Sequence, residues 1–287
     1  MFSLHDPILR PALFGVFLVL FIIWESLQPK RDRTFARLAR WTGNLGLIVV
    51  GSVVVRLILP IAPVGAALWA HQNGVGVFNT VPMPVPMWVA GALSFLLLDL
   101  LIYGQHRLFH KVPLLWRLHR MHHTDIDLDV TSGLRFHPLE ILLSLIIKVI
   151  AVVILGAPAL AVLVFEIVLN ATSMFNHANL ALPQRLDSVL RRIVVTPDMH
   201  RVHHSIDSSE TDSNFGFNLP WWDRLFGTYV EQPAAGHAAM TLGLPIFRDI
   251  KSVGLWNLLV QPFVEDSPEL KTGSDSKEGG NETSPPS

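Results

Sequence analysis

The sequence predicts an all-α fold in which polytopic membrane helices carry a helical cap at one membrane face. Half of the 287 residues are hydrophobic and only 16% are charged, whereas soluble domains have about 25% charged residues. The mean hydropathy is +0.41, and five long apolar segments run through the first 175 residues. Histidines at helical spacing begin where the third apolar segment ends, which predicts a polar helical cap beside the membrane.

The five apolar segments account for the membrane part of the fold. A helix needs about 20 residues to cross the hydrocarbon core, so the first and third segments are long enough. The second becomes long enough if it continues past Pro60, and the last two are separated by Gly156-Ala157-Pro158. We expect these two to form a helical hairpin that either just crosses the membrane or re-enters on one side. The segments are residues 8–27, 44–60, 86–104, 139–155 and 159–175.

Basic residues predict the orientation of these spans. The loop from Gln28 to Trp41 has five Lys or Arg residues against Asp32, while the loop at 69–85 has no charged residue. By the positive-inside rule the first loop is cytoplasmic, so the clustered histidines all lie on the cytoplasmic face of a multi-pass protein. No small-residue cleavage site follows the first apolar segment, which is therefore expected to be a retained span. A bacterial inner membrane is favoured over the endoplasmic reticulum as the host membrane.

Composition divides the chain into four parts. Residues 1–85 hold the N-terminal spans and the basic loop, and residues 86–230 form the membrane domain that carries the histidine clusters. Residues 231–265 are a C-terminal extension. The tail at 266–287 is polar and rich in Ser, Gly and Pro, so we expect it to be disordered.

Nine of the thirteen histidines form a spaced set that predicts a site for two metal ions. Imidazole is a common ligand of redox-active first-row metals, and a chain without cysteine must bind metal through nitrogen and oxygen. Residues three and four apart share one face of a helix, so each cluster can direct its rings to one point. Nine ligands suit two metals better than one. The nine are His106, His110, His119, His122, His123, His177, His200, His203 and His204.

Two neighbouring features of this set have open roles. Asp99 and Tyr103 continue the stripe of His106 and His110 back into the third span. Asp99 either orients a ligand imidazole or accepts a hydrogen bond from Tyr103, or else it packs as a carboxylate paired with another span, for example through Arg56. His137 is left between three roles: a tenth ligand, a hydrogen-bond partner of a ligand, or a residue that starts a helix.

Charged and aromatic residues outside the set predict packing rather than chemistry. Lys148 and Glu166 each lie nine residues from Ala157, so antiparallel helices bring them to the same depth. We predict that they form an ion pair inside the membrane that fixes the hairpin. The segment 214–229 combines a Phe-rich stretch and two adjacent tryptophans with the charged Asp223 and Arg224. It is expected either at the level of the lipid head groups or, for its aromatic residues, in the core.

The order of the motifs HRLFH, LHRMHH, FHPLE, NHANL, MHRVHH and WWDRLFGTY resembles the fatty acid hydroxylase and sterol desaturase superfamily of membrane di-iron enzymes. The resemblance covers about Asp99 to Tyr229. It implies two iron ions, with zinc as an alternative in purified protein, and dioxygen as a co-substrate. It also implies that the nine histidines are the ligands, while His137 matches a family histidine of unassigned role. No electron-transfer domain is recognisable in the chain, so a separate reductase or electron-transfer protein is expected as a partner.

The resulting functional prediction is a lipid hydroxylase or desaturase that acts on a fatty acyl or sterol-like substrate. A zinc-dependent membrane hydrolase is the first alternative, although the H-E-x-x-H pattern with its glutamate base does not occur. A metal transporter is the second, although its histidines would follow a path across the membrane. The net charge of −1 gives no argument for nucleic acid as a partner. The particular lipid, the choice between hydroxylation and desaturation, and the oligomeric state are left open.

Overall fold

The protein is all-helical over the residues that the computed structural model describes, which are 8–59, 61–82 and 85–265. Within these ranges there is no β-strand, and the only extended pairings are two isolated bridges, Pro29 with Leu180 and Ser205 with Leu242. The expected tail at 266–287 lies outside the described residues.

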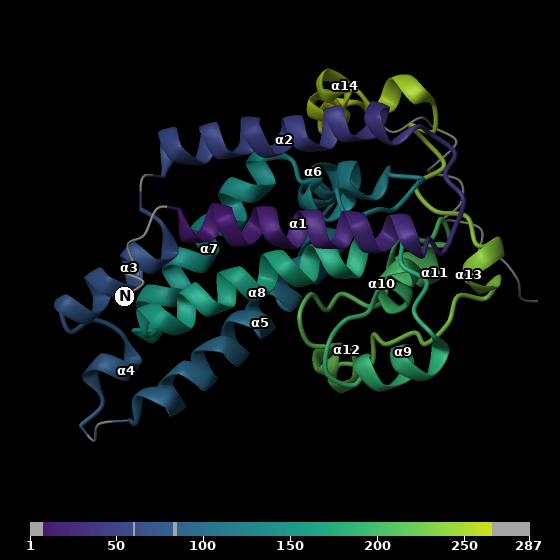
Figure 1. Cartoon of the computed structure of the whole chain (residues 1–287). Helices are drawn as coiled ribbons and strands as arrows, with labels where there is room; N and C mark the ends of the chain where they lie inside the picture. The colour runs from purple at the N-terminus through teal and green to yellow at the C-terminus, as the bar shows by residue number, and fades with distance from the viewer. Residues whose placement is uncertain (1–7, 60, 83–84, 266–287) are drawn as a thin grey trace, which may run out of the picture.

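Five long helices form the membrane part and run side by side along the molecule (Figure 1). All five stretches are long and apolar enough to cross a membrane by length and composition, the second of them counted through to Thr80. They agree with the predicted segments, but the second begins seven residues earlier and the third continues seven residues further. The five are α1 (Leu9–Leu27), α2 (Arg37–Ile58), α5 (Met87–Lys111), α7 (Pro138–Leu155) and α8 (Ala159–His177).

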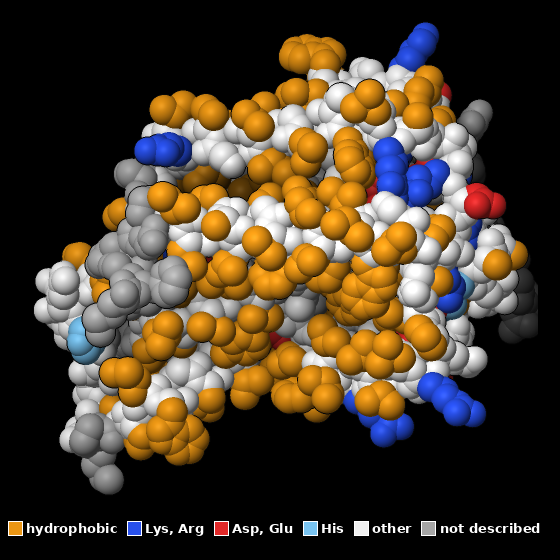
Figure 2. All heavy atoms as spheres, in the orientation of Figure 1, with side chains coloured by type: hydrophobic (Ala, Val, Ile, Leu, Met, Phe, Trp, Pro, Cys, Tyr) orange, Lys and Arg blue, Asp and Glu red, His pale blue; other side chains and the backbone are white. Residues whose placement is uncertain are grey.

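The outward faces of these helices are apolar, as a multi-pass membrane protein requires. Leu20 of α1, Val49 of α2 and Leu97 of α5 are among many large hydrophobic side chains that are exposed. Figure 2 shows hydrophobic side chains over much of the surface of α1 and α2, whereas most of the visible Lys and Arg side chains lie toward the end that holds α9 and α13. The polytopic architecture is therefore confirmed.

The hairpin of α7 and α8 turns sharply because Gly156 ends α7 in the left-handed conformation, with φ of 65°. Pro158 then precedes the first turn of α8. The predicted ion pair is present, with Lys148 Nζ 3.5 Å from Glu166 Oε1. Glu166 has a second cationic partner that sequence analysis did not identify, because Arg10 Nη2 lies 2.9 Å from Oε2.

The segment that joins the second and third spans is more structured than a loop. It contains α3 (Pro63–Gln72) and α4 (Val77–Thr80). Val64 and Ala67 of α3 are buried in one apolar cluster with Val152 of α7 and Val162 of α8. The small apolar residues of α3 explain this packing, since they let the short helix approach the hairpin closely.

Short helices and loops form a cap at the other end of the five long helices (Figure 1). Its core includes Leu47 of α2, Met121 and Leu258, so the C-terminal extension packs on the same core as the histidine-bearing helices. The cap elements are α6 (Pro113–His123), η1 (Ser132–Leu134), α9 (Gln184–Leu190), α10 (Pro197–His203), α11 (Ser208–Thr211), α12 (Trp221–Leu225), α13 (Gly236–Ala239), η2 (Ile250–Val253), α14 (Leu255–Val260) and η3 (Gln261–Phe263).

Candidate metal centre

Four helices bring the nine histidines of the predicted set to one place at the base of the cap. Helix α5 provides two from its last turns, α6 provides three, α8 ends on His177, and α10 with its C-terminal cap provides three. Helix α10 is held in position by its first residues: Pro197 fits the first turn and the Thr196 hydroxyl accepts a hydrogen bond from Met199 N. The convergence that the spacing predicted is present in full.

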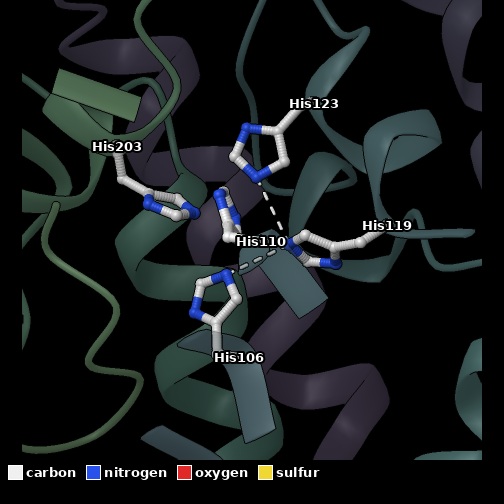
Figure 3. A group of neighbouring side chains, drawn as sticks. All are labelled: His106, His110, His119, His123 and His203. Carbon is white, nitrogen blue, oxygen red and sulfur yellow. Dashed lines mark hydrogen bonds between the residues drawn. The ribbon is translucent and has the colours of Figure 1, made fainter. Parts of the chain in front are cut away.

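The nine side chains divide into two groups. In each group the ligand nitrogens lie within 4.8 Å of one another. The first group, shown in Figure 3, directs five rings toward a common point. Its members are His106, His110, His119, His123 and His203; the second group is His122, His177, His200 and His204.

Hydrogen bonds fix the tautomers in the first group. His119 Nδ1 lies 2.7 Å from Glu140 Oε1, and His106 Nδ1 lies 2.8 Å from the Phe215 carbonyl oxygen. Both Nδ1 atoms therefore carry the proton and donate it, which leaves both Nε2 atoms as lone pairs. These two Nε2 atoms face each other at 3.0 Å (Figure 3). Two facing lone pairs cannot form a hydrogen bond with each other, whereas both can bind one cation.

The second group repeats this arrangement. His177 Nδ1 donates to the Ser173 carbonyl at 2.7 Å, and His122 Nδ1 donates to the Arg135 carbonyl at 3.1 Å. The two Nε2 atoms are again 3.0 Å apart, and His200 Nε2 lies 3.1 Å from that of His177. A metal with bonds of about 2.1 Å to two nitrogens at right angles separates them by about 3.0 Å. The residues of both groups thus fit a metal ion.

Several other ring nitrogens of the two groups are buried without a hydrogen-bond partner. Buried polar atoms are nearly always paired. Unpaired ring nitrogens that lie together in a cluster therefore fit a site for a metal ion. The atoms are His110 Nε2, His200 Nδ1, His203 Nε2 and both ring nitrogens of His204.

Burial keeps His122, His203 and His204 of the cap neutral. It lowers the pKa of His203 to about 3, and the neighbouring His119 adds to the effect. Burial, with help from nearby imidazoles, also holds the pKa values of His122 and His204 well below the usual 6.5. Neutral imidazole is the form that binds a metal, so these rings are ready to act as ligands at neutral pH.

A buried ion network supports the loop that follows α6. Arg40 Nη2 lies 2.6 Å from Asp125 Oδ2, and Arg40 Nη1 lies 2.5 Å from Asp129 Oδ2. Burial opposes ionisation of Asp125, but the guanidinium groups of Arg40 and Arg135 outweigh it and lower its pKa to about 2. Sequence analysis used Arg40 only as a topological signal, whereas its side chain is fully buried beside the metal centre.

Asp99 does not have the ligand-orienting role or the Arg56 partner that the sequence suggested. Its Oδ2 accepts hydrogen bonds from Trp222 Nε1 at 2.8 Å and from Leu219 N at 3.3 Å, while Arg56 is exposed. Asp99 therefore anchors the segment that contains Trp222. The reason is that α5 packs against this later segment. The carboxylate of Asp99 therefore contacts the indole of Trp222 and not the imidazole of a histidine.

Tyr103 contacts the site indirectly. Its hydroxyl lies 2.9 Å from Thr228 Oγ1, which in turn donates to Asp223 Oδ1 at 2.7 Å. Asp223 accepts hydrogen bonds from the backbone N–H groups of Phe215 and Gly216, both at 2.8 Å. The Phe215 carbonyl then accepts from His106, so Tyr103 and Asp223 together position the imidazole of His106. Burial raises the pKa of Asp223 to about 6.

The segment 214–229 is divided between the two expected environments. Phe215 and Phe217 are buried in the core. Trp221, Leu225 and Phe226 are exposed, as a head-group-level segment requires. Asp223 is fully buried and is therefore structural, which corrects its interpretation as an interfacial charge.

His137 lies outside both histidine groups. It starts α7: its Nδ1 accepts a hydrogen bond from Leu139 N at 3.3 Å, and its Nε2 lies 3.2 Å from the Leu259 carbonyl oxygen. Of the three roles considered, this geometry matches the helix-start residue. Three residues later, Glu140 holds His119. Sequence analysis quoted Glu140 within the FHPLE motif but assigned it no role, since its contact spans 21 residues.

Comparison with known proteins agrees with this site. Residues 91–228 match the family model described as fatty acid hydroxylase, which confirms the resemblance of this part of the chain to that family. It is 33% identical over 148 residues to ornithine lipid hydroxylase OlsE of Rhizobium tropici, a match that covers 52% of this chain and 44% of the relative.

Two animal relatives each match about half of the chain. Alkylglycerol monooxygenase of Homo sapiens is 28% identical over 163 residues, or 55% of this chain and 34% of the relative. Cholesterol 25-hydroxylase of Rattus norvegicus is 28% identical over 137 residues, or 47% of this chain and 45% of the relative. The chain thus spans less than half the length of these curated relatives. No solved structure matches the chain significantly.

Proposed function

We propose that this protein is a membrane di-iron oxygenase that hydroxylates a lipid with dioxygen and externally supplied electrons. The observation that carries the proposal is the pair of histidine groups in which tautomer-fixed Nε2 lone pairs face each other at 3.0 Å. In this proposal the nine histidines are the ligands, five to one iron and four to the other. Iron is proposed over zinc because the relatives are named as hydroxylases and monooxygenases.

A cavity beside the first histidine group supports a lipid substrate. It has a volume of about 340 Å³, within the range of about 300–1,000 Å³ typical of ligand sites. His106 and His119 line one end together with the neighbouring Phe136 and Phe217. Ile141 and Leu145 of α7 are among the apolar residues that line it along the membrane helices. A hydrocarbon chain from the bilayer fits such a cavity, because the apolar lining of the cavity replaces the contacts that the chain makes with lipid.

The protein's own residues would contribute positioning and exclusion of water. Glu140 and the Phe215 carbonyl hold His119 and His106 in the tautomer that presents Nε2 to the metal. Phe136 and Phe217 keep the substrate carbon beside these rings in an apolar environment. The bound iron ions would supply activation of dioxygen. We assign no protein acid or base to the removal of hydrogen from the substrate.

The wider assignment follows from the same features. The catalytic domain would span 86–230, preceded by the spans of 1–85 and followed by the extension at 231–265. The cap would face the cytoplasm of a bacterial inner membrane, where a separate electron-transfer protein can reach it. Hydroxylation is favoured over desaturation because each named relative is a hydroxylase or monooxygenase.

Oxygen uptake tests the proposal. Iron-loaded protein in lipid nanodiscs is given a chemical reductant and a total lipid extract, and oxygen consumption is followed before mass spectrometry of the lipids. We expect uptake together with a +16 mass change in one lipid class, and loss of both in His203→Ala. An absence of uptake with iron fully bound would favour the zinc hydrolase, in which case the same extract would show cleaved lipids.

A further inference from the structure

The cavity beside the histidines continues along α7 to a charged end. Glu140, Ser144 and Lys148 are four residues apart, so they lie on one face of the helix, and all three line the cavity. At 1.5 Å per residue, Lys148 lies about 12 Å along the helix from Glu140, which contacts His119. The cavity therefore has a histidine end and a lysine end.

The lysine end has more positive than negative charge. Lys148 Nζ is 3.5 Å from Glu166 Oε1, while Arg10 Nη2 is closer to the same carboxylate, at 2.9 Å from Oε2. One carboxylate is thus shared by two cations. The side chains of Lys148 and Glu166 are only 12% and 11% exposed. Among the described residues no other acidic side chain forms an ion pair with Lys148, so its ammonium has N–H groups available to the cavity.

A neighbouring hydroxyl is also available. Ser144 Oγ accepts a hydrogen bond from Gln105 Nε2 at 2.8 Å, which leaves its own proton free to be donated. Ser144 lies one turn of α7 from Lys148 on the cavity side. An ammonium that shares its only carboxylate partner and a hydroxyl that can donate its proton, both at one end of a mainly apolar cavity, suit a ligand that carries oxygen atoms.

We propose that Lys148 and Ser144 bind the anionic head group, carboxylate or phosphate, of a single-chain lipid whose hydrocarbon extends toward His106 and His119. As an assignment of the substrate class, this rests on the proposed function. The physical reason is charge balance: a buried ammonium that shares its carboxylate is stabilised by a second anion. The established ion pair with Glu166 then fixes the lysine in place.

The proposal has a consequence for the position of oxidation. An extended chain advances about 1.2 Å per bond, so 12 Å corresponds to about ten bonds. The oxygen is therefore introduced about ten bonds from the head group and not beside it.

Binding to metal-free protein tests the proposal independently of turnover, so its failure is distinct from failure of the oxygenase function. The probes are radiolabelled dodecanoate, dodecyl phosphate and dodecanol, which share one chain and differ in head group. In nonionic detergent the native protein is expected to bind an anionic probe at least tenfold more tightly than the alcohol. The tighter of the two anions identifies the head group as carboxylate or phosphate.

Variants locate the effect. Lys148→Met leaves Arg10 and Glu166 as a matched pair, so it is expected to fold and to bind all three probes equally weakly, while Lys148→Arg retains the preference. Arg56→Met removes an exposed cation from α2 and is the control, with the preference unchanged. Equal binding of the three probes to the native protein, or a preference that survives in Lys148→Met, would overturn the proposal. The native comparison needs no variant, so misfolding cannot obscure the result.

Discussion

His203 and His204 are consecutive residues whose rings belong to different histidine groups. Their ring planes are 88° apart and their centroids are 5.3 Å apart. His203 lies with His106 and His110, whereas His204 lies with His122 and His177. The end of one short helix therefore contributes to both groups, and the same relation holds for His122 and His123, whose planes are 86° apart.

This division predicts that the two sites can be emptied separately. His203→Ala removes a ligand from the first group only, and His204→Ala removes one from the second group only. We expect the native protein to bind two metal ions per chain and each variant to retain one under stringent dialysis. Metal analysis by mass spectrometry checks this. Two ions retained by both variants, or loss of both ions from either, would contradict the assignment of separate sites.

Glu140→Gln is expected to weaken metal binding without removing a ligand. The carboxylate holds His119 Nδ1–H at 2.7 Å and thereby raises the basicity of Nε2. Loss of such a partner typically costs 10–100-fold in metal affinity. Competition with a chelator of known affinity measures the change. The matched control is Glu231→Gln, whose side chain is exposed; an equal loss in both variants would argue against a specific role of Glu140.

Arg40→Met is expected to destabilise the fold strongly. The substitution removes the cation that Asp125 and Asp129 share, while both carboxylates stay buried. Breaking a buried ion pair in this way lowers the free energy of unfolding by about 3–5 kcal/mol. Arg56→Met lies on the same helix but at an exposed position, where changes of about 0.5 kcal/mol or less are usual. Denaturant unfolding in detergent compares the two. Similar unfolding free energies would show that the Arg40 network is not structural.

The metal-free protein is expected to lose stability as the pH falls below about 6.5. The pKa of His203 is lowered to about 3 in the folded protein, whereas the unfolded chain takes up a proton near the usual 6.5. Between these values the unfolded state binds more protons, so the unfolding free energy decreases by up to about 1.4 kcal/mol per pH unit for each such histidine. Unfolding midpoints from pH 7.5 to pH 5 measure the slope. A flat profile would mean that the buried rings titrate normally.

Local patterns in the sequence predicted the helices and the convergence of the nine histidines well. Apolar length gave the five spans, and i, i+3 and i+4 spacing placed His119, His122 and His123 on one helix. The pairing of Lys148 with Glu166 also followed from local counting, since a tight turn makes the two helices antiparallel and equal in depth.

Contacts between distant segments were not predictable in this way. The separation of His122 from His123 depends on where α8 and α10 converge. Asp99 meets Trp222 across 123 residues, and Arg40 meets Asp125 across 85. Helical periodicity gives the face on which such a residue lies, but it contains no information on the segment that packs there.

The source of the oxygen atom in the product tests the central claim most directly. Iron-loaded protein in nanodiscs is supplied with reductant, lipid extract and ¹⁸O₂ in ordinary water, and the lipids are analysed by mass spectrometry. A lipid oxygenase predicts a product with a mass increase of 18 in place of 16, absent from both His203→Ala and His204→Ala. Products that carry only unlabelled oxygen from the water, with no dependence on dioxygen, would contradict the account and identify the protein as a hydrolase.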